Sequence, residues 1–135
     1  MRAALARLLG RDPTLGGWGE RLAARHLARA GYRVLGRNVR TKMGELDLVA
    51  LAPDARTLVV VEVKTRRTRA ETTPHTPRPE DALTRAKRER LVRLARVEAK
   101  RRSMERSPLR IDVIAIEKPD TGRPTLRHHE RAVTA

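Results

Sequence analysis

The chain has 135 residues, the length of one typical domain, and its 39% hydrophobic content is enough for a buried core. Lysine and arginine number 31 against 16 acidic residues, which gives a net charge of +15 and favours a polyanionic partner, most often nucleic acid. The absence of cysteine excludes disulfides and thiolate metal sites and is compatible with a cytoplasmic location. No apolar run is long enough to cross a bilayer, so no membrane partner is expected.

The first predicted element is a helix from about residue 18 to residue 30, after a glycine-rich turn. Gly31 follows it as a plausible C-cap. Its apolar face carries Ala23 and Leu27 at helical spacing, and Glu20 lies on that same face. The helix dipole favours an acid in a first turn, but this does not explain why the acid is on the apolar side.

Three strands are predicted next, over residues 32–39, 44–51 and 58–64. The turn between the last two is short, and positions 47 and 62 are almost equidistant from its centre. An antiparallel hairpin therefore places Asp47 directly opposite Glu62, with Cβ atoms about 4.5–5.5 Å apart. Two carboxylates that close repel each other unless a positive group lies between them.

The segment from about residue 66 to 79 has no periodicity, and we expect a mobile loop there. A long basic helix is predicted over about 79–101, a buried strand over 109–116 and a short edge strand over 125–129. A strand-helix-strand crossover predicts that the third and fourth strands are parallel in an otherwise antiparallel sheet. The expected fold class is therefore α/β, a mixed central β-sheet flanked by helices in the order α-β-β-β-α-β(-β).

Convergence of Glu20, Asp47 and Glu62 would create a site of hard oxygen ligands, for which Mg²⁺ or Mn²⁺ is the natural occupant. Such an ion would polarise a phosphate and lower the pKa of a bound water. Lys64 lies on the same strand face as Glu62. It would position or deprotonate that water, or stabilise charge in the transition state.

The alternative is a structural ion-pair cluster, in which Lys64 or Arg110 neutralises the acids and no metal binds. The histidines are weaker candidates for a site. His26 is expected on a helix surface, and His128 and His129 are adjacent on a strand, so their side chains face opposite ways and cannot chelate one ion together.

The second helix is strongly basic, with few acids to balance it. A solvated helix face is the ordinary explanation of such a pattern, and contact with phosphates is its rival. The cations that we expect to bind the nucleic-acid backbone are Arg40, Lys42, Arg66, Arg85, Lys87 and Arg88.

The motifs of this chain, taken together and in order, resemble those of the bacterial YraN-like family. They are Gly16-x-x-Gly19-Glu20, Asn38-Val39-Arg40, Gly44-Glu45-Leu46-Asp47-Leu48-Val49-Ala50, Val61-Glu62-Val63-Lys64-Thr65-Arg66 and Arg110-Ile111-Asp112-Val113. That family is placed in the PD-(D/E)xK, restriction-endonuclease-like superfamily, near archaeal Holliday-junction resolvases. The resemblance implies a catalytic core of Asp47, Glu62 and Lys64, with Glu20 as the helix acid. Lys87 matches a lysine in the second helix of the family.

The resemblance also implies one nuclease-like domain over residues 15–132, after an N-terminal extension over residues 1–14. The expected function is that of a metal-dependent DNA endonuclease, with branched or single-stranded DNA as candidate substrates. A non-catalytic nucleic-acid-binding protein with a relic site is the alternative, and an adaptor whose charge only aids solubility is a third. Symmetric cutting of a junction would require a homodimer.

Overall fold

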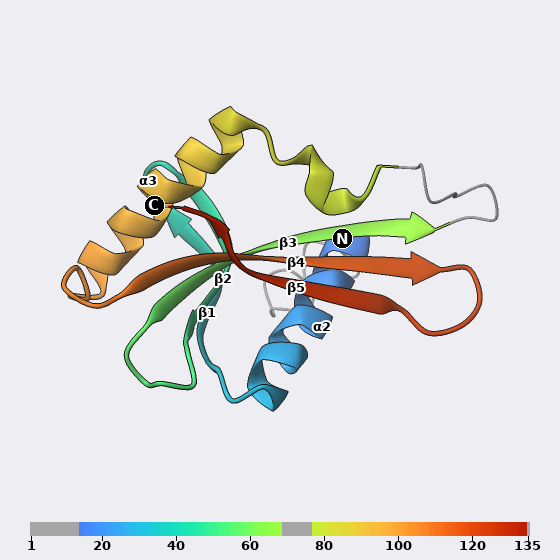
Figure 1. The fold of residues 1–135 in the computed structure, drawn as a ribbon, viewed down its shortest axis with the longest axis horizontal. Coiled ribbons are helices and arrows are strands. Elements are labelled where there is room, and N and C mark those ends of the chain that lie inside the picture. The colour runs from blue at the N-terminus through green and yellow to red at the C-terminus, as the bar shows by residue number, and fades with distance from the viewer. Residues whose placement is uncertain (1–13, 69–76, 135) are drawn as a thin grey trace, which may run out of the picture.

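The computed structural model describes residues 14–68 and 77–134, which form two α-helices, a short 3₁₀ helix and one five-stranded sheet (Figure 1). The strands stand in the sheet in chain order, β1-β2-β3-β4-β5. β3 and β4 are parallel, and every other neighbouring pair is antiparallel. This confirms the expected α/β class, its element order and the single parallel pair. The N-terminal extension, residues 1–14, lies outside the described residues except for Thr14.

The first helix, α2, spans Leu15–Arg29 and begins earlier than its sequence predicts. Thr14 caps it, because its side-chain oxygen accepts a hydrogen bond from the backbone N–H of Gly17 at 3.1 Å. The glycines at 16, 17 and 19 therefore lie inside the helix and not in a turn. Gly17 and Gly19 are buried, so tertiary packing explains why residues of low helix propensity stand there.

The strands differ from their expected bounds mainly at their ends. β1 spans Arg33–Thr41, β2 spans Gly44–Leu51, β3 spans Leu58–Thr68, β4 spans Leu109–Pro119 and β5 spans Thr125–Val133. The start of the expected loop at 66 is thus wrong, because residues 66–68 pair with residues 117–119 of β4. The central part of that loop, 69–76, lies outside the described residues.

The long helix expected over 79–101 is divided in two. The 3₁₀ helix η1 spans Pro79–Ala82, and α3 spans Arg85–Arg101. Thr84 separates them because its side-chain oxygen accepts from the N–H of Lys87 at 3.2 Å and so caps α3.

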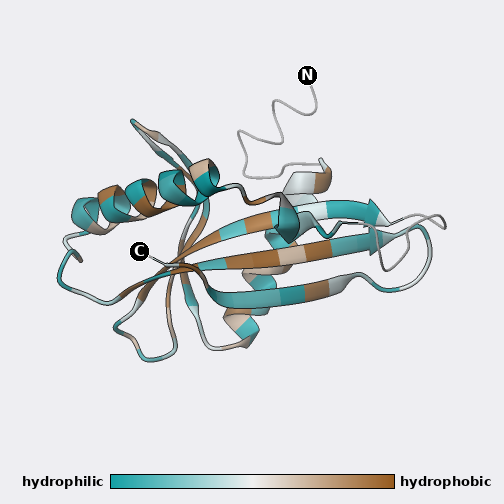
Figure 2. Cartoon of the chain, turned by 45° about the horizontal axis from the view of Figure 1, so that its top comes forward, coloured by the Kyte–Doolittle hydropathy of each residue, from teal (hydrophilic) through white to brown (hydrophobic). Residues whose placement is uncertain are grey.

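Each face of the sheet is covered by one helix. On one face, α3 packs Leu91, Leu94 and Ala95 against a cluster that includes Val60 and Ile111. On the other, α2 packs against a second cluster, made by residues of β2, β3 and β4 whose side chains point the opposite way. The hydrophobic segments in Figure 2 lie along the strands between these helices, with hydrophilic residues at the outer ends. Neither α-helix of the described residues is long and apolar enough to cross a membrane.

Candidate functional site

The candidate site lies where β2 and β3 separate. Their pairing runs from Leu51 opposite Leu58 to Leu48 opposite Val61 and stops there, although both strands continue. The next position on each strand is Asp47 on β2 and Glu62 on β3, so the register is the one that the hairpin predicted. The side chain of Asp47 bridges the opening, because its Oδ2 accepts a hydrogen bond from the backbone N–H of Val63 at 2.8 Å.

Asp47 is electrostatically strained by its surroundings. Burial, the negative charge of Glu62 and the negative charge of Glu20 together raise its pKa from 3.8 to about 8, although the hydrogen bond from Val63 acts in the opposite direction. The structure therefore brings Glu20 and Glu62 within electrostatic reach of Asp47. We call Glu20, Asp47 and Glu62 the acidic site.

Glu20 reaches this site because α2 approaches β3 very closely at Gly19. A Cβ atom added to Gly19 would lie 2.0 Å from the side-chain oxygen of Thr65, so only glycine fits at this contact. Residue 20 follows directly, which explains why the glycine precedes the helix acid.

Asn38 links two acids and was not predicted as a site residue. With its amide nitrogen facing the carboxylates, it donates to Glu20 Oε2 at 3.0 Å and to Glu45 Oε1 at 3.2 Å. Its φ of 47° is a left-handed conformation, which asparagine tolerates better than most residues. The signal in the sequence that could have identified Asn38 as a site residue is an asparagine inside a predicted strand.

Lys64 contacts the acidic site through Glu62, with 3.2 Å between Lys64 Nζ and Glu62 Oε1. Of the two cations considered for an ion-pair cluster, Lys64 is thus the one that pairs with Glu62. Arg110 pairs with Asp112 instead, with 2.9 Å between Arg110 Nη2 and Asp112 Oδ2.

A cleft of about 210 Å³ opens beside Glu62, between β3 and α3. Carboxylates and cations share its wall: Glu45, Glu62 and Lys64 come from the strands, and Lys87 and Arg90 come from α3. This mixture of acids and cations suits a phosphate that is held by the cations next to an ion that is held by the acids.

The donor chemistry of the acidic site fits Mg²⁺ or Mn²⁺, since all three groups are carboxylates, and burial together with the charges of Glu62 and Glu20 raises the pKa of Asp47. The positions of these side chains do not yet form a complete set of metal ligands. Within residues 14–68 and 77–134, no three histidine, aspartate or glutamate side chains already stand together as a metal-ligand set.

The cations predicted to bind nucleic acid are scattered more widely than the acids. Lys87 lines the cleft, and Arg40 and Lys42 line a second hollow at the β1–β2 turn. Arg66 is bound to Glu117 through its Nε at 2.6 Å, and Arg85 is bound to Glu89 at 3.1 Å. Arg88 lines a separate pocket with Glu80, and Arg90, which was not predicted, lines the cleft.

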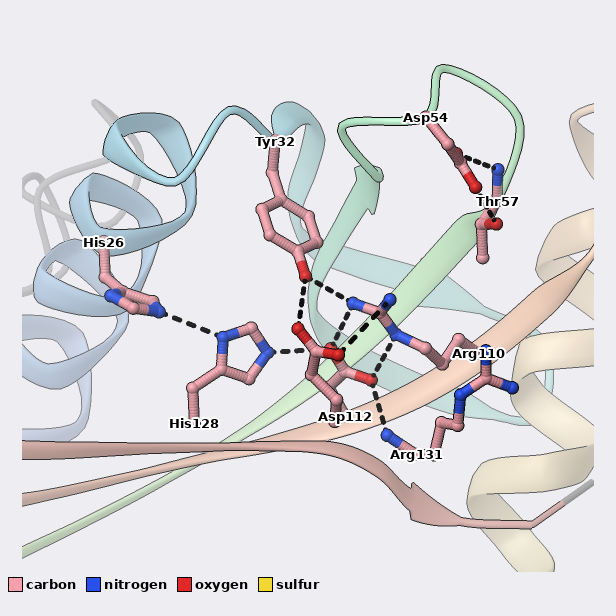
Figure 3. A network of polar contacts seen from close by, with 9 residues as sticks. His26, Tyr32, Asp54, Thr57, Arg110, Asp112, His128 and Arg131 are labelled. Atoms are coloured by element: carbon pink, nitrogen blue, oxygen red, sulfur yellow. Dashed lines mark hydrogen bonds and ion pairs between the residues drawn. The ribbon is translucent and has the colours of Figure 1, made fainter.

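A second polar network lies on the α2 face of the sheet (Figure 3). Asp112 is fully buried and accepts from Arg110 Nε at 2.9 Å and from the N–H of Arg131 at 3.1 Å, and it contacts His128 Nε2 at 2.7 Å. Although burial alone would raise it, the hydrogen bonds from His128 and Arg110 hold the pKa of Asp112 below its usual value. This network ties β4 to β5, and we interpret it as a structural anchor.

His26, expected on a helix surface, is half-buried on α2 and contacts a second histidine. Its Nε2 is 3.0 Å from Nδ1 of His128. Burial and the neighbouring His128 lower the pKa of His26. His128 and His129 do face opposite ways, since His129 contacts Glu80 at 2.8 Å on the other side of β5.

The fold and the site define a mixed α/β protein with three carboxylates and a lysine at the fork of its central strands. Residues 19–116, which include all four of these side chains, match the model of the uncharacterised protein family UPF0102. The chain belongs to this family, the YraN family that its motifs resemble.

Relatives in this family cover most of the chain. A UPF0102 protein from Symbiobacterium thermophilum is 44% identical over 117 residues, which are 87% of this chain and 93% of the relative. One from Pelobacter propionicus is 44% identical over 113 residues, or 84% of this chain and 77% of the relative. Among solved structures, SfsA from Pyrococcus furiosus in complex with Ca²⁺ is similar with a TM-score of 0.39 and 15% identity, over 92% of this chain and 66% of that one.

Proposed function

We propose that this protein is a metal-dependent endonuclease that hydrolyses phosphodiester bonds in DNA. The observation that carries the proposal is the register of β2 and β3, which places Asp47 and Glu62 side by side at the end of their pairing. Lys64 is on the second of these strands and contacts Glu62. The net charge of +15 supports a polyanionic substrate.

In this proposal Asp47 and Glu62, together with Glu20, hold Mg²⁺ or Mn²⁺ at the fork. When bound, the ion supplies Lewis acidity and a water of lowered pKa. The hydrogen bond from Val63 fixes the Asp47 carboxylate, and the one from Asn38 orients Glu20. These contacts reduce the freedom of two ligands before an ion arrives.

The remaining chemistry falls to the cations. Lys64 Nζ lies 3.2 Å from Glu62, so it is close enough to hold or deprotonate the attacking water, or to stabilise the charge that develops on the phosphate. Lys87 and Arg90 line the same cleft from α3 and would hold the flanking phosphates.

A cleavage panel tests this function. Purified protein with Mg²⁺ or Mn²⁺ is incubated with labelled single-stranded, flapped, branched and fully paired DNA, and with RNA of the same sequences. We expect cutting of at least one DNA form, abolished in Asp47→Ala and Glu62→Ala while DNA binding is retained. Asp120→Asn, which removes an exposed acid in the β4–β5 turn, is the matched control and should cut normally. Activity that survives both alanine substitutions would contradict the proposal.

One observation favours a second candidate, a nucleic-acid-binding protein with a relic site. Lys64 already pairs with Glu62, and the described residues hold no assembled metal-ligand set. This alternative predicts binding that weakens steeply with salt, no cutting in any metal and no heat of Mn²⁺ binding.

A further inference from the structure

A second hollow, of about 740 Å³, lies against the β1–β2 turn. We call it the hairpin hollow. Its lining comes from the turn and from the C-terminal half of α3: Arg40, Thr41, Lys42, Met43, Val97, Lys100 and Arg101. Figure 1 shows this turn passing alongside α3.

The apolar side chains of the lining, which we call its floor, are exposed. Met43 is 48% exposed and Val97 is 36% exposed, and they are the two large hydrophobic side chains of the described residues that stand out in this way. Single exposed apolar residues are ordinary. Here two of them, distant in the sequence, share one hollow, which indicates a ligand with an apolar face.

The charged residues of the lining, which we call its rim, are all cations. Arg40, Lys42 and Lys100 are exposed, and Arg101 is exposed although it also pairs with Glu98 at 2.6 Å. Two apolar side chains that share a hollow with four cations are complementary to a ligand that combines a flat apolar ring with negative charges. The methionine thioether adds a favourable contact with aromatic rings.

The hollow and the cleft beside the acidic site are both lined by α3. The helix residues that line the two, from Lys87 and Arg90 to Val97 and Arg101, follow one another at spacings of three, seven and four residues and so share one face of α3. Gly44 lies between them, against the guanidinium of Arg90. At about 1.5 Å per residue, the segment from Lys87 to Arg101 spans about 21 Å.

We infer that the hairpin hollow holds an unpaired base of a nucleic-acid strand whose phosphates run along this face of α3 to the acidic site. The inference rests on the proposed function, and it names the substrate class as single-stranded or flapped nucleic acid. In a paired duplex the bases are stacked and present only their edges in the grooves, so an apolar floor has nothing to contact. An unpaired strand presents base faces and phosphates together.

Binding measurements on a protein that cannot cut test this inference. The Asp47→Asn protein is titrated with a fluorescent 20-nucleotide single strand, a flapped duplex and a blunt duplex, without divalent metal and at several salt concentrations. In that background, Met43→Gln with Val97→Thr keeps size and charge but removes the apolar floor. We expect about tenfold weaker binding of the single strand and the flap, with the blunt duplex unchanged.

The charge at the rim is tested separately. Lys42→Gln with Lys100→Gln should lower the slope of log affinity against log salt by about 0.7 for each phosphate of the single strand that the variant no longer neutralises. Arg25→Gln with Arg29→Gln removes two exposed cations from α2, on the other face of the sheet, and is the matched control that should leave this slope unchanged. Melting curves of every variant verify that the fold is intact.

The outcomes separate the two proposals. If the floor variant loses single-strand binding but the wild-type protein cuts nothing, the hollow stands and the nuclease proposal fails. If the wild-type protein cuts and the floor variant binds and cuts single strands as before, the nuclease stands and the hollow proposal is overturned. Tighter binding of blunt duplex than of single strand, or of anionic lipid vesicles than of either, would also overturn it.

Discussion

Asp47 is hydrogen-bonded to the backbone of the neighbouring strand, with 2.8 Å between its Oδ2 and the nitrogen of Val63. This contact takes the place of the strand pairing that ends one residue earlier, at Leu48 opposite Val61. The fork in the sheet therefore leaves a backbone donor unpaired and satisfies it with the acid that we propose as a metal ligand. The same geometry places that acid beside Glu62, where its charge is unfavourable.

Because the folded protein raises the pKa of Asp47 from 3.8 to about 8, it binds a proton that the unfolded chain releases. The contribution of this group to the free energy of unfolding is therefore largest below about pH 4 and falls as the pH rises to about 8, by at most about 1.4 kcal/mol per pH unit. Asp47→Asn removes that penalty. In EDTA at pH 8 we expect a higher melting temperature for this variant than for the wild type, and a smaller difference at pH 5.

The same variant reports on metal binding without an activity assay. Mn²⁺ binds the folded state, so it should raise the melting temperature of the wild type and leave that of Asp47→Asn almost unchanged. Asp120→Asn, an exposed position, should respond to Mn²⁺ like the wild type. Equal stabilisation of all three proteins would show that the ion binds elsewhere.

Gly19→Ala should disturb both stability and the site. The added methyl group would meet the Thr65 side chain at 2.0 Å, so α2 must shift away from β3. We expect a loss of about 1–3 kcal/mol in the free energy of unfolding, and weaker Mn²⁺ binding because Glu20 moves with the helix. Gly16→Ala is the matched control, since its nearest neighbour lies 3.9 Å away. Urea unfolding of both variants measures the difference, and equal stabilities would refute the close-approach argument.

Asp112→Asn should be among the most destabilising single changes in the protein. It leaves Arg110 without the carboxylate it pairs with at 2.9 Å in a buried place, and breaking one partner of such a pair costs about 3–5 kcal/mol. Glu130→Gln alters an exposed acid that is 3.9 Å from the same arginine, and it should change stability by less than about 1 kcal/mol. Chemical denaturation compares the two, and a small effect of Asp112→Asn would mean that the network is not an anchor.

Glu80 provides a test of pH dependence away from the acidic site. The hydrogen bond from Arg127 lowers the pKa of Glu80 from 4.5 to about 2, and the hydrogen bond with His129 adds a smaller effect in the same direction. Its stabilising contribution is therefore complete above about pH 4.5 and is lost as the pH falls toward 2. Glu80→Gln should reduce stability near pH 7 by about 1.5–3 kcal/mol, and its gap to the wild type should narrow below pH 4.5. A gap of the same size at pH 6 and pH 3 would contradict this assignment.

The sequence was sufficient to predict the pairing of Asp47 with Glu62, because a short turn leaves an antiparallel hairpin few choices of register. It was also sufficient for the parallel pair, since a helical crossover between two buried strands requires it. The signal for the hairpin is local, within about 20 residues, whereas the signal for the crossover lies in the order of the elements.

Other features depend on contacts that a single sequence does not reveal. Arg66 lies at the far end of β3, although the sequence predicts a loop there. It is held in the strand by Glu117 on β4, whose Oε1 accepts a hydrogen bond from Arg66 Nε at 2.6 Å. The glycines of α2 suggested a turn. Gly19 instead lies in the helix, where the Thr65 side chain leaves no room for a Cβ atom. His26 and His128 are 102 positions apart, so no spacing rule could have joined them.

The most direct test of the central claim is the single-turnover rate at which the protein cuts a labelled flapped DNA in Mn²⁺. We expect cutting by the wild type that stops in EDTA, falls at least about a thousandfold in Asp47→Asn and Glu62→Gln, and is unchanged in Asp120→Asn. Wild-type protein that binds the flap but leaves it intact in every metal, or variants that cut as fast as the wild type, would contradict it.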